Sequence, residues 1–62
     1  MMKVRDVIKM IERDGWTLHS TRGSHRQFMH QSKCGRVTIA GHPSHDTNPA
    51  ILTSIRKQAG LR

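Results

Sequence analysis

The sequence has 62 residues, with 11 Lys or Arg against four Asp or Glu, and its formal net charge is +7 at pH 7. A chain of this length forms one domain at most and buries only about 60% of the surface that its unfolded form exposes. We therefore expect a single domain over residues 1–62 with a small core. The charge favours a polyanionic partner, which could be nucleic acid, an anionic membrane or an acidic protein.

Composition disfavours several classes of protein. No apolar run approaches the roughly 18–20 residues of a transmembrane helix, and charged residues stand where a signal peptide would be apolar. Cys34 is the single cysteine, so no internal disulfide can form, which is typical of a reducing, cytoplasmic compartment. Trp16 and Phe28 are the two aromatic residues, too few for a sheet that stacks several bases on rings.

A first helix is predicted near the start of the chain. Apolar residues spaced i, i+3, i+4 and i+7 give it one buried stripe: Val4, Val7, Ile8 and Ile11. Gly15 suits the left-handed position that follows a helix, and Trp16 can then fold back onto Ile11. Because the core needs this stripe, we do not expect the helix to lie on a membrane.

A second helix is predicted near the end of the chain. Asn48 is a good N-cap and Pro49 a good first helical residue. Gly60 ends the helix in the same way as Gly15 ends the first one. The predicted buried stripe consists of Ile51, Leu52, Ile55 and Ala59.

Three short strands are predicted between the helices, over residues 16–20, 25–31 and 36–40. Polar and apolar residues alternate in the first and third, and the second is predicted because Ser32-Lys33-Cys34-Gly35 is typical of a hairpin turn that leads into the third. The predicted fold class is α+β, in the order α-β-β-β-α, with a three-stranded antiparallel sheet and both helices on one face. The sheet would contribute core residues Trp16, Leu18, Phe28, Val37 and Ile39. If Phe28 points inward, alternation turns His25, Gln27 and Met29 outward.

The turn before the second strand carries the most informative residues. A neutral histidine is the usual general base near pH 7, and His25 stands at the start of the strand. Arg22 and Arg26 could hold a phosphate, and backbone N–H groups around Gly23 and Ser24 could bind an anion. The same residues could also form a solvated turn without function.

A second cluster of titratable residues lies in the loop before the last predicted helix. His42, His45 and Asp46 could bind a metal together with Cys34 or His30, but structural zinc sites need four ligands at recognisable spacings. The segment fits a polar loop better. We therefore predict neither a metal nor another cofactor.

The hairpin after the second strand contains Cys34 between two cations, Lys33 and Arg36. Neighbouring cations can activate a thiol, but no histidine is forced beside it, so we expect an incidental surface cysteine. Positive charge spread along a chain is often only a solvated surface, but here basic residues outnumber acidic ones 11 to four. We therefore predict polyanion binding, with Lys33, Arg36 and His42 as further RNA contacts.

Taken together, these segments make the chain resemble the HicA family of bacterial and archaeal toxins over residues 3–61. The residues that carry the resemblance are Ile11-Glu12-Arg13-Asp14-Gly15-Trp16, Arg22-Gly23-Ser24-His25 followed by Phe28 and His30, Val37-Thr38-Ile39 followed by His42, and Lys57-Gln58-Ala59-Gly60-Leu61.

The resemblance implies a fold similar to the double-stranded-RNA-binding domain. It also implies a toxin of a type II toxin–antitoxin pair, a metal-independent mRNA interferase in which His25 is the catalytic residue and which a HicB antitoxin silences. We expect the toxin alone to be a monomer. The alternative is a non-catalytic RNA-binding module of the same fold.

Overall fold

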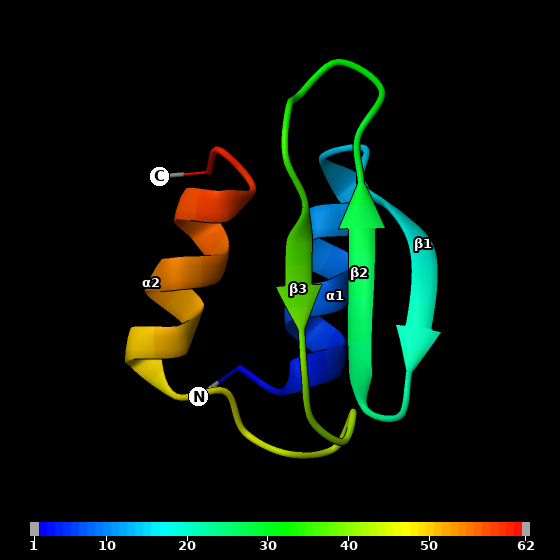
Figure 1. Ribbon diagram of the computed structural model, residues 1–62. Helices are drawn as coiled ribbons and strands as arrows, with labels where there is room; N and C mark the ends of the chain where they lie inside the picture. Colours follow the sequence, from blue (N-terminus) through cyan, green and yellow to red (C-terminus); the bar gives the residue numbers. More distant parts are fainter. Residues whose placement is uncertain (1, 62) are drawn as a thin grey trace.

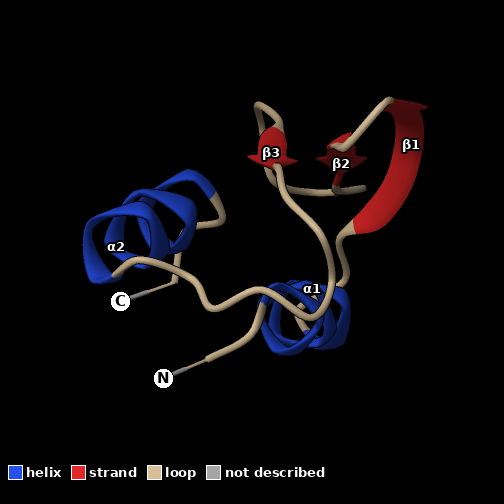
Figure 2. Cartoon of the chain, turned by 90° about the horizontal axis from the view of Figure 1, so that it is seen from below, coloured by secondary structure: helices blue, strands red, loops and turns tan. Residues whose placement is uncertain are grey.

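The computed structural model describes residues 2–61 of the predicted domain. Its elements are α1 (Val4–Arg13), β1 (Thr17–Arg22), β2 (His25–Met29), β3 (Val37–Ile39) and α2 (Pro49–Gln58). The strands form one antiparallel sheet in the order β1-β2-β3 (Figure 1). Both helices lie on the same face of this sheet, and the opposite face is open (Figure 2). The predicted α+β fold and its α-β-β-β-α order are confirmed, and the arrangement is consistent with a double-stranded-RNA-binding-domain-like fold.

The first helix begins and ends with local hydrogen bonds. At its start, the Asp6 carboxylate accepts the Lys3 N–H at 3.1 Å. At its end, Gly15 adopts a φ of +104° and the Trp16 N–H donates to the Ile11 carbonyl at 3.1 Å. This is the Schellman ending that the Gly-Trp pair predicts, and it directs the chain from α1 into β1 with Trp16 buried.

The second helix has equally clear ends. The Asn48 side chain accepts the Ala50 N–H at 2.8 Å, as an N-cap does. After the helix, Gly60 has a φ of +72° and the Leu61 N–H donates to the Arg56 carbonyl at 2.7 Å. Within residues 2–61, neither helix is long and apolar enough to cross a membrane.

The core lies between the helices and the covered face of the sheet. Its fully or nearly fully buried apolar residues are Val4, Val7, Ile11, Trp16, Phe28, Val37, Ile39, Ile55 and Ala59.

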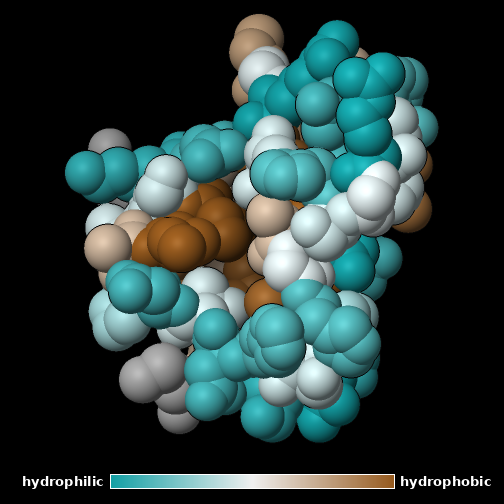
Figure 3. Space-filling view, turned by 60° about the horizontal axis from the view of Figure 1, so that its bottom comes forward, coloured by the Kyte–Doolittle hydropathy of each residue, from teal (hydrophilic) through white to brown (hydrophobic). Residues whose placement is uncertain are grey.

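Two residues predicted for the core are exposed instead. Leu18 is 53% exposed, although it pairs with buried Phe28. It lies on the edge strand away from α2, whereas Val37 and Ile39 of the other edge strand, β3, lie beside α2 and are buried (Figure 2). Ile51 is 56% exposed because the first turn of α2 borders a hollow beside the loop that follows β3. Apolar surface exposed in a hollow is visible in Figure 3.

Candidate active site

The open face of the sheet carries His25 at the start of its central strand. His25 pairs with Arg22 across the β1–β2 turn, and its side chain is exposed. Because side chains alternate along a strand, His25 and Gln27 face away from buried Phe28. An open hollow of about 630 Å³ lies here, lined by Ser20, Thr21, Arg22, His25, Gln27 and Thr38. The structure therefore places His25 among polar groups that solvent, and a ligand, can reach.

The β1–β2 turn is a two-residue connection formed by Gly23 and Ser24. Gly23 has a φ of +59°, and positive φ at the first position is the arrangement of a type II′ hairpin turn. An added Cβ at Gly23 would find nothing within 4 Å, so the space beside this backbone is free. The turn thus allows close approach of a ligand next to His25.

Arg26 lies on the other face of β2 from His25. It pairs with buried Ile39, and its Nη1 donates to the Gly41 carbonyl at 3.0 Å and to the Ser24 carbonyl at 3.4 Å. The Gly41 N–H in turn donates to the Ser24 carbonyl at 3.3 Å. The guanidinium therefore connects the β1–β2 turn to the loop after β3. The sequence predicts that Arg22 and Arg26 hold one phosphate, but Arg26 is not among the residues that line the hollow with Arg22.

Two other arginines border the open face. Arg22 lines the hollow directly. Arg36, just before β3, extends its Nη1 to within 3.2 Å of the Gln27 Oε1. Arg22 beside His25 and Arg36 beside Gln27 thus give this face positive charge that suits a phosphate.

His42 lies in the loop after β3 and is exposed, outside the set of residues that line the hollow. Its Nδ1 accepts the Ser44 N–H at 3.2 Å and lies 2.8 Å from the Ser44 hydroxyl oxygen. The His42 and His45 rings are 5.4 Å apart. Within residues 2–61, no group of three His, Cys, Asp or Glu side chains gathers as a metal site would require.

The opposite end of β2 leads to a histidine with a different environment. His30 Nδ1 accepts the backbone N–H groups of Ser32 at 3.0 Å and Lys33 at 3.2 Å, so this nitrogen carries no proton. The Nε2 must then carry the hydrogen, which it donates to the Asp14 carbonyl at 2.7 Å. The ring also makes an edge contact with Trp16, with centroids 5.2 Å apart. His30 therefore joins the β2–β3 loop to the end of α1.

Lys33 lies at this same end and not on the open face. Its ammonium contacts the Asp14 carboxylate and donates to the Ala59 carbonyl at 3.1 Å. Asp14 and Ala59 are the C-caps of α1 and α2, so one cation serves the negative ends of both helix dipoles. The hydrogen bond from Lys33 lowers the pKa of Asp14 below its usual value. These contacts differ from the RNA contact that the sequence suggested for Lys33.

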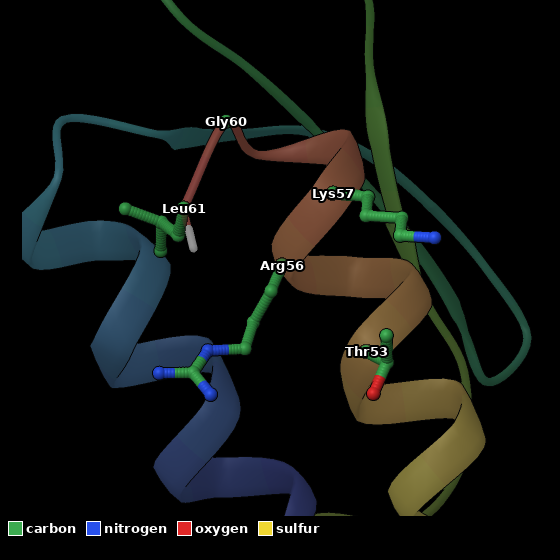
Figure 4. Close-up of a pocket in the computed structure, with 5 residues that line it drawn as sticks. All are labelled: Thr53, Arg56, Lys57, Gly60 and Leu61. Atoms are coloured by element: carbon green, nitrogen blue, oxygen red, sulfur yellow. The ribbon is translucent and has the colours of Figure 1, made fainter.

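A second hollow, of about 650 Å³, lies at the end of α2 and is lined by Thr53, Arg56, Lys57, Gly60 and Leu61. Figure 4 shows the Arg56 and Lys57 side chains leaving the helix in different directions. The hollow shares no lining residue with the one around His25. Positive charge thus occurs at both places, but only the His25 hollow combines it with a group able to accept a proton.

Sequence reasoning missed the roles of Gln27, His30 and Lys33. Strand alternation had already placed Gln27 on the same face as His25, so that signal was present in the sequence. The contacts of His30 and Lys33 with Asp14 join residues that are 16 and 19 positions apart, and no local pattern indicates them.

The chain matches a known protein family over most of its length. Residues 4–61 match the family model described as the HicA toxin of bacterial toxin–antitoxin. A search of curated proteins finds no match. The matched range spans all five secondary-structure elements and includes the β1–β2 turn with His25.

Proposed function

The chain belongs to the HicA toxin family, and we propose that it is the toxin of a type II toxin–antitoxin pair and cleaves mRNA as a metal-independent endoribonuclease. The observation that carries this proposal is the exposed His25 beside Arg22, in a polar hollow on the uncovered face of the sheet. A general base needs such access, because it must come within hydrogen-bond reach of the proton that it removes.

The proposed reaction uses a nucleophile that belongs to the substrate. Neutral His25 accepts the proton of a ribose 2′-OH while the 2′-oxygen forms a bond to the adjacent phosphorus. The bond from phosphorus to the 5′-oxygen breaks, and that oxygen takes a proton and leaves as a hydroxyl. The products are a 2′,3′-cyclic phosphate and a 5′-hydroxyl end. Because the 2′-oxygen attacks directly, the reaction needs no metal-bound water.

The charges around the hollow suit this substrate. Arg22 can bind the phosphate and stabilise the negative charge that grows on it. The free space beside Gly23 lets the phosphate approach the backbone of the turn. In this proposal Ser24 and Arg26 act indirectly, because their contacts with Gly41 fix the position of the turn. Arg36 and His42 would add weaker contacts to the RNA.

The experiment is cleavage of a single-stranded RNA by the purified protein in the presence of EDTA. We expect fragments with 2′,3′-cyclic phosphate ends, and we expect the His25→Ala variant to lose cleavage by about 10²–10⁴-fold, the usual contribution of a general base. His19→Ala is the matched control, because His19 is an exposed histidine on the neighbouring strand. RNA that is bound and retarded but never cut would select the non-catalytic module instead.

We further propose that a HicB-type antitoxin binds this toxin and covers the open face. The net charge of +7 predicts that the partner presents acidic residues there. Both the mRNA and the antitoxin would be met in the cytoplasm. Covering His25 would protect RNA from cleavage, so the complex should be inactive and should regain activity when it is dissociated.

A further inference from the structure

We infer that Gln27 is a second group that binds the scissile phosphate, through its amide NH₂, and that Arg36 is the residue that positions this amide. The inference rests on the proposed ribonuclease function and adds to it a donor that neither the family match nor the motif around His25 assigns. It starts from the hydrogen bond of 3.2 Å between Arg36 Nη1 and Gln27 Oε1.

The position of Gln27 in the sheet is the first argument. Gln27 follows His25 by two residues on β2, so both side chains leave the same face about 7 Å apart along the strand. In the sheet register Gln27 stands between Ser20 of β1 and Thr38 of β3, and all three line the hollow with His25. Gln27 is half-buried, whereas His25 is exposed. A phosphate held against His25 therefore lies within reach of the Gln27 amide.

The orientation of the amide is the second argument. A guanidinium group has donors and no acceptor, so the amide atom that faces Arg36 must be the oxygen. The NH₂ group then points away from Arg36. Within residues 2–61, the structure gives this NH₂ no protein acceptor, although the side chain is half-buried. Two oriented donors without a partner, in a hollow beside a general base, are suited to the oxygens of a phosphate.

In the proposed reaction, the two amide donors of Gln27 would stabilise charge on the phosphate. Negative charge grows on the non-bridging oxygens of the phosphate as the 2′-oxygen attacks, and a donor already in place stabilises that charge without reorganisation. An amide can do this without exchanging a proton, so it does not compete with His25 for the 2′-OH proton. The Arg36 charge also strengthens the amide as a donor, because it polarises the carbonyl oxygen.

The direct test is the Gln27→Met variant, which keeps the length of the side chain and removes both donors. We expect the single-turnover cleavage rate at saturating RNA to fall by about 10²-fold, with the midpoint of thermal unfolding unchanged. Gln31→Met is the matched control, because Gln31 is exposed beyond the other end of β2. A Gln27→Met rate within about threefold of the wild-type rate would overturn the inference.

Gln27→Met also removes the oxygen that accepts the Arg36 hydrogen bond, so a second variant is needed that keeps this acceptor. Gln27→Glu keeps an acceptor for the guanidinium and replaces the NH₂ by a carboxylate oxygen that repels phosphate. We expect cleavage by this variant to fall at least as far as that of Gln27→Met. Cleavage close to the wild-type rate would show that the donors do not contact the phosphate.

The role of Arg36 is tested by a double-mutant cycle. If Arg36 acts by orienting Gln27, Arg36→Met lowers the single-turnover cleavage rate at saturating RNA, where weaker binding has no effect, by about tenfold in the wild-type background and changes it little when Gln27→Met is already present. A loss of the same factor in both backgrounds would contradict the positioning role. A purely structural role of Arg36 would lower the unfolding midpoint in both backgrounds without this coupling in the rate.

These outcomes separate the inference from the function on which it rests. If His25→Ala abolishes cleavage but Gln27→Met does not lower it, the ribonuclease proposal stands and the role of Gln27 is overturned. If wild-type protein does not cleave RNA, or if His25→Ala cleaves as fast as wild type, the proposed function fails and takes this inference with it.

Discussion

The two ends of β2 carry histidines in opposite situations. His25 begins the strand, is exposed, and lines an open hollow. His30 follows the end of the strand, and both of its ring nitrogens are engaged in hydrogen bonds with protein groups. The cations nearby differ in the same way, because Arg22 borders the hollow while Lys33 contacts the C-caps of both helices.

This difference teaches that residue type alone does not distinguish a reactive group from a structural one. A histidine whose two nitrogens are both bonded cannot accept a substrate proton without breaking part of the fold. A histidine free to bind can do so at little cost in stability. We therefore expect substitutions at the His30 end to change the stability of the protein, and substitutions at the His25 end to change its activity.

The largest effect on stability is expected for Gly15→Ala. The added Cβ would lie 2.7 Å from His30 Nε2, and the φ of +104° is unfavourable for any residue with a side chain. Backbone strain and displacement of His30 together should lower the free energy of unfolding by about 3 kcal/mol. Gly35→Ala is the control, because Gly35 has a φ of +88° and nothing within 4 Å of an added Cβ. Equal losses in urea unfolding would contradict the proposed contact with His30.

The next largest effect is expected for His30→Ala. The substitution leaves the N–H groups of Ser32 and Lys33 and the carbonyl of Asp14 without their partner. We expect the free energy of unfolding to fall by about 2 kcal/mol. The same substitution at exposed His19 should change it by less than about 0.5 kcal/mol. Chemical denaturation of the two variants measures both values, and a stable His30→Ala protein would contradict the structural role.

A smaller effect is expected for Lys33→Met. The contact with Asp14 is partly exposed and screened by solvent, so losing it together with the interaction with the helix ends should lower stability by less than His30→Ala does. The affinity for RNA should change little, because Lys33 is placed away from the open face. Arg36→Met should show the reverse, with weaker RNA binding and nearly unchanged stability. If Lys33→Met weakens RNA binding more than Arg36→Met, the assignment of the two cations is reversed.

The smallest effect is a dependence of stability on acid pH. The contact with Lys33 lowers the pKa of Asp14 in the folded protein. The unfolded state therefore binds a proton more readily, so this contribution is present above the unfolded pKa of about 3.9 and is lost as pH falls through the folded value. We expect Asp14→Asn to flatten the acid part of the stability profile, as measured by unfolding at a series of pH values. A profile that stays as steep as the wild-type one would contradict this role.

Local signals in the sequence were sufficient for much of the fold. The spacing of apolar residues and the glycines at 15 and 60 predict both helices and their ends, because capping depends on neighbouring residues. Burial was predicted less well where it depends on position in the whole fold. Leu18 has the alternation of a core strand residue, but it lies on the edge of the sheet away from α2 (Figure 2). Ile51 lies beside a hollow next to the loop after β3.

Some features of the candidate site can likewise be predicted from local sequence, and others depend on the whole fold. The sequence indicates the turn through Gly23 and Ser24, and strand alternation indicates the direction of His25. The contacts of Arg26 with Gly41 and of Arg36 with Gln27 join different segments of the chain, and only the folded arrangement reveals them. Distant pairing thus decides which arginine can face the substrate and which one holds the turn.

The central claim is that the His25 end of β2 acts on RNA while the His30 end stabilises the fold. The most direct test is the single-turnover cleavage rate of one RNA by His25→Ala and His30→Ala, in EDTA and at a temperature where both variants are folded. The account predicts that His25→Ala loses cleavage and that His30→Ala cleaves at close to the wild-type rate. Cleavage retained by His25→Ala, or lost by a folded His30→Ala, would contradict it.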